Sequence, residues 1–94
     1  MDIYETVLAK SVIKDLKKLP KHIVINLHLW IANIKLHGLR KTQQILGYHD
    51  EPLLGKRAGQ RSIRLNKSYR AIYIIDKNEN VCFIEVLEVT KHEY

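Results

Sequence analysis

The first half of the chain carries two helical patterns of apolar residues. From Ser11 to Leu19 apolar residues recur every three or four positions with lysines between them, as in a helix with one buried stripe. Pro20 breaks this pattern and can begin a second helix, which Gly38 can end. The buried stripe of the second helix is expected to be Ile23, Leu27, Trp30, Ile31 and Ile34. The sequence therefore predicts one short helix and a longer one over 21–37.

The longer helix also carries a second apolar stripe, which is more apolar surface than one sheet usually covers. This stripe consists of Ile25, Leu29, Ala32 and Leu36. Either the short segment 39–46 folds back over it, or a partner protein or a second copy of the chain covers it. The pattern alone leaves both alternatives open.

The remaining apolar segments are short and β-rich, and most of them lie in the second half of the chain. The predicted strands are Ile3–Leu8, Arg61–Asn66, Tyr69–Asp76 and Val81–Thr90. The last three are joined by short polar turns, as in antiparallel hairpins. The segment 47–59 contains three glycines and a proline and is predicted to be a loop. We expect an α+β fold, a small antiparallel sheet with two or three N-terminal helices on one face and the other face free for a ligand.

Length and composition restrict the class of protein. The 94 residues suffice for one compact core, so a single domain over 1–94 is expected. No run of about 18 apolar residues and no signal-peptide pattern is present, and the only cysteine, Cys82, can form neither a disulfide nor a Cys-based zinc site within the chain. The histidines lack metal-ligand spacing, and no glycine-rich nucleotide motif follows a strand. We expect a cytoplasmic protein without metal, cofactor or membrane partner.

Positive charge is concentrated in the middle of the chain. The net charge is +6, and residues 38–70 hold eight Lys or Arg against two Asp or Glu. Six of these basic residues fall within fifteen positions: Lys56, Arg57, Arg61, Arg64, Lys67 and Arg70. An anion-binding surface is predicted there.

Arg70 stands out because its neighbours in the predicted strand are apolar or aromatic. A charge in such a place is costly unless it is paired. Its partner is either Glu85 or Glu88, in an internal ion pair, or the phosphate of a ligand.

Four segments together resemble the RelE/HigB/YoeB toxins of the RelE/ParE superfamily. They are HDEPLLG (49–55), RSIRL (61–65), YRAIY (69–73) and the ending KHEY (91–94). The order of strands and helices fits the same family. The resemblance implies a RelE-like fold and a toxin of a type II toxin–antitoxin system. It also implies two partners: messenger RNA in the 30S decoding site of the ribosome, and a cognate antitoxin protein.

The resemblance further implies a metal-independent endoribonuclease, an mRNA interferase that inhibits translation. Such an enzyme needs a base for the 2′-hydroxyl, a cation on the phosphate and an acid at the departing 5′-oxygen. Glu51 matches the base, Arg70 the cation, and His92 or Tyr94 the acid. The residues implied to bind RNA are Lys56, Arg57, Arg61 and Arg64 on its backbone and Tyr48 or Tyr94 on a base.

The alternative is a ParE-like inhibitor of DNA gyrase, which has the same fold and cuts nothing. Fold alone cannot choose between an enzyme and a binding protein. The terminal pair His92 and Tyr94 favours the nuclease, because ParE-like proteins usually lack such a cluster.

Overall fold

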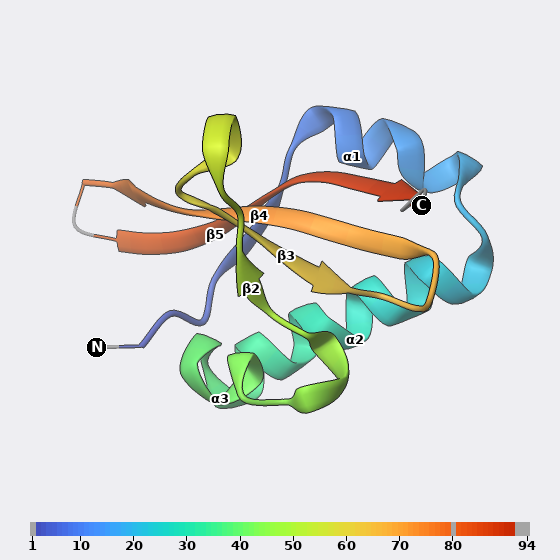
Figure 1. Cartoon of the computed structure of the whole chain (residues 1–94). Coiled ribbons are helices and arrows are strands. Elements are labelled where there is room, and N and C mark those ends of the chain that lie inside the picture. Colours follow the sequence, from blue (N-terminus) through green and yellow to red (C-terminus); the bar gives the residue numbers. More distant parts are fainter. Residues whose placement is uncertain (1, 80, 92–94) are drawn as a thin grey trace.

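The computed structural model describes residues 2–79 and 81–91. In this part of the chain, helices lie against a five-stranded sheet of order β1-β5-β4-β3-β2 (Figure 1). The strands are β1 (Thr6–Leu8), β2 (Glu51–Pro52), β3 (Gln60–Arg64), β4 (Tyr69–Asn78) and β5 (Val81–Lys91), and the helices are α1 (Lys10–Asp15), α2 (Lys21–His37) and α3 (Leu39–Gln43). Short 3-10 turns are η1 (Leu16–Lys18), η2 (Leu46–Tyr48) and η3 (Gly55–Arg57). The predicted α+β class is confirmed.

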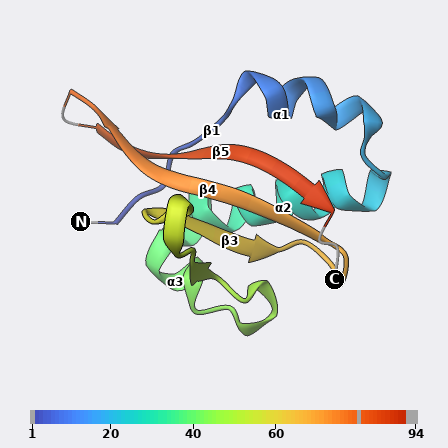
Figure 2. The same ribbon diagram turned by 45° about the horizontal axis from the view of Figure 1, so that its top comes forward.

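The sheet is mixed, so the prediction of a wholly antiparallel sheet is wrong at one edge. Strands β3, β4 and β5 form the expected antiparallel meander, but β1 pairs parallel to β5, with Val7 opposite Glu85. Figure 2 shows β1 beside β5, followed by β4 and β3. The direction of β5 is set by the hairpins that precede it, whereas a three-residue strand carries no pattern that fixes the direction of its partner.

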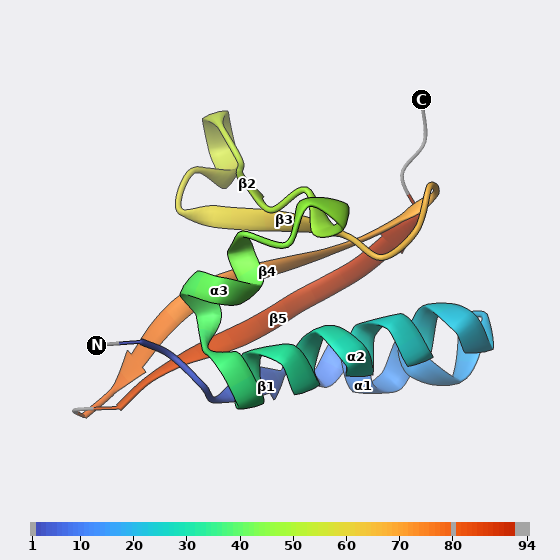
Figure 3. The same cartoon turned by 90° about the horizontal axis from the view of Figure 1, so that it is seen from below.

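The core lies between the sheet and the helices α1 and α2, which are on the same side of β4 and β5 (Figure 3). Of the predicted stripe of α2, Ile23, Leu27, Trp30 and Ile34 are fully buried, and Ile31 is partly buried. The rings of Trp30 and Tyr73 lie 5.2 Å apart between centroids. The period of 3.6 residues therefore identified the buried face of this helix correctly.

The second apolar stripe of α2 is exposed. Ile25, Leu29 and Leu36 each keep more than half of their surface accessible. The segment 39–46 instead forms α3, which buries Leu39 and Thr42 beyond the end of α2. The alternative that this segment covers the stripe is therefore wrong. No helix in residues 2–79 and 81–91 has the length and apolar character needed to cross a membrane.

The N-terminal segment is tied to the start of α3 by Asp2. Its Oδ1 atom accepts hydrogen bonds from the backbone N–H of Ile3 (2.8 Å) and of Arg40 (3.1 Å). Desolvation alone would raise the pKa of Asp2, but the hydrogen bonds from Arg40 and Ile3 outweigh it and hold this pKa below its usual value. Gly38 has φ +86° beside this carboxylate, and a Cβ there would collide with it.

We expect Asp2→Asn to lower the melting temperature near pH 6 and to have little effect near pH 2. A carboxyl whose pKa is lower in the folded state stabilises the fold above its unfolded pKa of about 3.9. That contribution disappears as the pH falls through the folded-state value. Melting curves of both proteins across this range measure the difference.

The matched control is Asp15→Asn, because Asp15 is exposed and makes no capping hydrogen bond with its side chain. A difference between Asp2→Asn and the parent protein that stays constant with pH would contradict the role of the charge.

Candidate functional site

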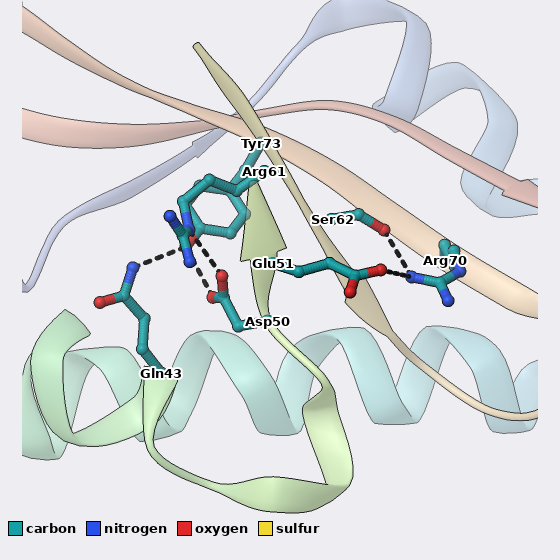
Figure 4. Close-up of polar contacts among 7 residues, drawn as sticks. All are labelled: Gln43, Asp50, Glu51, Arg61, Ser62, Arg70 and Tyr73. Carbon is teal, nitrogen blue, oxygen red and sulfur yellow. Dashed lines mark hydrogen bonds and ion pairs between the residues drawn. The ribbon is translucent and has the colours of Figure 1, made fainter. Parts of the chain in front are cut away.

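A carboxylate, a hydroxyl and a guanidinium meet on the face of the sheet away from α1 and α2 (Figure 4). Arg70 Nη1 donates to Ser62 Oγ at 3.0 Å and to Glu51 Oε1 at 3.4 Å. These side chains come from β2, β3 and β4, in which Glu51 lies opposite Ser62, and Arg70 lies opposite Arg64. Ala71 and Tyr73, which alternate with Arg70, are buried towards the helices. Strand alternation therefore places the polar cluster on the open face.

The charged partner of Arg70 is Glu51, so the alternative of an internal ion pair with Glu85 or Glu88 is wrong. Glu88 instead pairs with Arg57, from η3. Glu51 and Arg70 are 19 residues apart, and their contact forms only because β2 joins the sheet at the edge next to β3. The sequence did not predict this pairing.

A groove of about 440 Å³ runs past the Glu51 carboxylate and the Arg70 guanidinium. Its lining residues are Glu51, Leu53, Arg57, Ser62, Arg70, Ile72 and Thr90. The side chain of Glu51 is 59% exposed and that of Arg70 is 17% exposed. The carboxylate is thus open to a ligand, while the guanidinium is held by its neighbours.

A second polar network lies on the opposite side of β3 and is largely buried. Asp50, whose side chain is 1% exposed, accepts from Arg61 Nε at 2.7 Å and from the Tyr73 hydroxyl at 2.6 Å. Gln43 Nε2 from α3 donates to the same hydroxyl at 3.1 Å. The network therefore connects the segment before β2 to α3, β3 and β4 (Figure 4).

The network shifts two acid–base equilibria upward. Burial would lower the pKa of Arg61, but the hydrogen bond and the charge of Asp50 raise it above its ordinary value. Burial raises the pKa of Tyr73 well above that of free tyrosine, and the hydrogen bond to Asp50 raises it further. Arg61 stays charged and Tyr73 stays neutral, so Asp50 faces one cation and one hydroxyl donor.

The other residues expected to bind RNA lie in different places. Lys56 and Arg57 are exposed on η3. Arg64 and Tyr48 line a separate hollow of about 300 Å³ beside α2, and the Tyr48 hydroxyl accepts from Asn33 at 3.2 Å. Arg61 is engaged by Asp50 on the helix side of the sheet. The structure therefore places only Arg57 of this set in the groove with Glu51 and Arg70.

The two residues expected to supply the acid, His92 and Tyr94, lie outside the described residues. Within 2–79 and 81–91, no three His, Cys, Asp or Glu side chains are grouped so that they could hold a metal ion.

Sequence reasoning missed Ser62 as a neighbour of Arg70, and it missed the network of Asp50, Tyr73 and Gln43. The alternation of β3 already placed Ser62 and Arg64 on one face, which was the available signal for the first of these. No comparable signal marked Asp50, because the loop around it has no periodicity.

Three comparisons relate the chain to known proteins. A family model described as "ParE toxin of type II toxin-antitoxin system, parDE" matches residues 7–92. No curated protein matches the chain. Among solved structures, a YoeB/ParE toxin from Agrobacterium tumefaciens is 23% identical with a TM-score of 0.68, covering 95% of this chain and 99% of the other.

Two further structures are similar. YafQ from E. coli is 16% identical with a TM-score of 0.69, covering 93% of this chain and 91% of the other. The YoeB–YefM complex from Staphylococcus aureus contains a chain that is 20% identical with a TM-score of 0.67, covering 96% of this chain and 97% of the other. At these identities the three likenesses establish the fold.

We expect Tyr73→Phe to lower the free energy of unfolding by about 2 kcal/mol, because it removes a hydrogen bond to a buried carboxylate. The ring and its contact with Trp30 are retained, so the change isolates the hydroxyl. Urea unfolding followed by fluorescence measures the difference, with the exposed Tyr4→Phe as control. Equal stability of the two variants would show that the hydroxyl contributes nothing to holding Asp50.

Proposed function

The chain belongs to the ParE toxin family of type II toxin–antitoxin systems, and we propose that it is a toxin that cuts messenger RNA at the ribosome without a metal ion. Membership of the RelE/ParE superfamily, expected from the sequence, is confirmed by the family match. The observation that carries the nuclease proposal is the pair Glu51 and Arg70 in an open groove, which supplies a base beside a cation.

The proposed reaction begins when an RNA phosphate enters the groove and binds Arg70 and Ser62. Glu51 accepts the proton of the adjacent 2′-hydroxyl, whose oxygen forms a bond to phosphorus. Arg70 stabilises the negative charge that develops on the phosphate oxygens. The bond from phosphorus to the 5′-oxygen breaks, and His92 or Tyr94 donates a proton to that oxygen. The products are a 2′,3′-cyclic phosphate and a 5′-hydroxyl end.

In this proposal the exposed cations Lys56 and Arg57 and the half-buried Arg64 bind neighbouring phosphates, and Tyr48 stacks on a base. Arg61 is assigned to the fold rather than to RNA, because its partner Asp50 is buried, whereas Glu88, the partner of Arg57, is partly exposed. The groove and these cations lie on or near the 38–70 segment, which contains eight of the sixteen Lys and Arg residues.

The second proposed partner is a cognate antitoxin. Two similar structures are complexes with a second protein: YoeB–YefM from S. aureus, and the DinJ–YafQ toxin–antitoxin complex from E. coli. The exposed stripe of Ile25, Leu29 and Leu36 on α2 offers an apolar surface for such a partner.

The alternative function is gyrase inhibition, which the description of the matching family favours because it names ParE and parDE. A protein that only binds gyrase has no need of a base beside a phosphate-binding cation. Loss of gyrase supercoiling without RNA breaks would identify the alternative.

We expect Arg70→Ala to reduce RNA cutting by about 10²–10³-fold, because it removes the cation that faces the developing phosphate charge. The purified protein is added to a translating extract, and messenger RNA ends are mapped by primer extension. Arg40→Ala is the matched control, since it removes the same charge from the exposed surface of α3. If folded Arg70→Ala cuts RNA at the full rate, Arg70 has no catalytic role and only neutralises the charge of Glu51.

We expect the general acid to be revealed by a substrate with a better leaving group. If His92 donates the proton, His92→Gln loses about 10²–10⁴-fold on normal RNA but is largely rescued on a 5′-thio linkage. If Tyr94 donates it, the rescue is found with Tyr94→Phe instead. A truncation after Thr90 that cuts at the full rate would refute both assignments and favour the gyrase alternative.

A further inference from the structure

We infer that Asp50 is a positioning residue, which fixes the direction of Glu51 by its contacts on the opposite side of the sheet. The inference rests on the proposed role of Glu51 as the base. Its physical basis is that Asp50 binds Arg61 and Tyr73 on one side of the sheet, whereas the adjacent Glu51 binds Arg70 on the other.

Strand β2 alone is a weak support for Glu51. It contains only Glu51 and Pro52, paired with Ser62 and Arg61. Pro52 has no N–H group and cannot donate to the ladder. The next backbone hydrogen bond to β3 is donated by the N–H of Leu53 to the carbonyl oxygen of Gln60, at 2.9 Å. A strand this short leaves the side chain of Glu51 dependent on what holds the residues before it.

The residue directly before Glu51 is held tightly. The Asp50 carboxylate accepts two short hydrogen bonds, from Arg61 of β3 and from Tyr73 of β4. Tyr73 is itself fully buried, and its ring contacts Trp30 of α2. Asp50 is thus fixed to two strands of the sheet and, through Tyr73, to the helical layer.

The chain on the other side of Asp50 is also constrained. His49 adopts a left-handed conformation (φ 46°, ψ 49°), which turns the chain between η2 and β2. The preceding Tyr48 is bound by Asn33 of α2. The turn at His49 is exposed, whereas the Asp50 carboxylate is buried. The contacts of Asp50 therefore fix the position of the backbone from which the Glu51 side chain extends.

Each of the two carboxylates also pairs with a different arginine, Asp50 with Arg61 and Glu51 with Arg70. Asp50 neutralises Arg61 on the helix side, so Arg61 does not compete with Arg70 for Glu51. Without Asp50, Arg61 would lose this carboxylate, and Arg61 lies one strand position from Ser62, which is opposite Glu51. Loss of Asp50 should therefore draw Glu51 away from the groove.

The test is a double-mutant cycle of Asp50→Asn and Glu51→Gln, measured as kcat and KM for RNA cutting. Asp50→Asn alone should lower kcat by about 10–10²-fold, because a shift of about 1 Å in a reacting group can cost that much. KM should change little, since Lys56, Arg57 and Arg64 still bind RNA. In the Glu51→Gln background, Asp50→Asn should cause no further loss of kcat.

A matched control separates positioning from stability. Val12→Ala shortens a buried side chain of α1, far in sequence from the loop, and should lower the melting temperature while leaving kcat per folded molecule unchanged. Should Asp50→Asn fail to fold, Tyr73→Phe removes one of the two bonds to Asp50 and should show the same non-additivity with Glu51→Gln at a smaller loss.

Two kinetic results would overturn the inference: an undiminished kcat in Asp50→Asn, or losses that multiply in the double variant. A crystal structure of the variant gives a readout without activity, because the contact between Glu51 Oε1 and Arg70 Nη1 should be lost. If Glu51→Gln is itself fully active, the proposed base is refuted, and an unchanged contact in that structure would separately refute the positioning role.

Discussion

The position of the loop before β2 depends on one interaction, the hydrogen bonding of the buried Asp50 carboxylate to Arg61 and Tyr73. A charge taken out of water is expensive unless its partners satisfy it, and here one guanidinium and one hydroxyl do so at short distances. Those partners lie on β3 and β4, so the charge cannot be satisfied unless the loop lies against the sheet. The need to satisfy the Asp50 charge therefore holds the loop that contains Asp50 against the β3 edge of the sheet, although strand β2 has only two residues.

The same requirement explains why a polar network can coexist with the apolar core. Tyr73 presents its ring to Trp30 and its hydroxyl to Asp50 and Gln43, so one side chain belongs to both environments. The helices cover only one face of the sheet, which leaves the other face for Glu51, Ser62 and Arg70. Neighbouring residues of the same strands therefore serve the two faces: in β4, Ala71 and Tyr73 pack in the core, while Arg70 binds Ser62 on the open face.

The sequence predicted the features that depend on periodicity. The buried stripe of α2, the three-stranded meander and the position of Arg70 among apolar residues follow from spacings of 3.6 and 2. It did not predict the parallel pairing of β1, the partner of Arg70 or the engagement of Arg61 by Asp50. Each of these depends on which segments distant in sequence meet at a sheet edge, and a loop without periodicity gives no sign of that.

The two carboxylate–arginine pairs differ in a way that suits different tasks. Asp50 and Arg61 are joined at 2.7 Å with the carboxylate buried, and breaking such a pair by removing one partner costs about 3–5 kcal/mol. Glu51 and Arg70 are 3.4 Å apart with the carboxylate largely exposed, and such pairs contribute about 0–1 kcal/mol. Under the proposed function, an incoming phosphate can therefore displace Glu51 from Arg70 at little cost, while the inner pair persists. In the proposed reaction, the outer pair keeps Arg70 oriented until the phosphate arrives, and the released carboxylate is then beside the 2′-hydroxyl that must lose a proton.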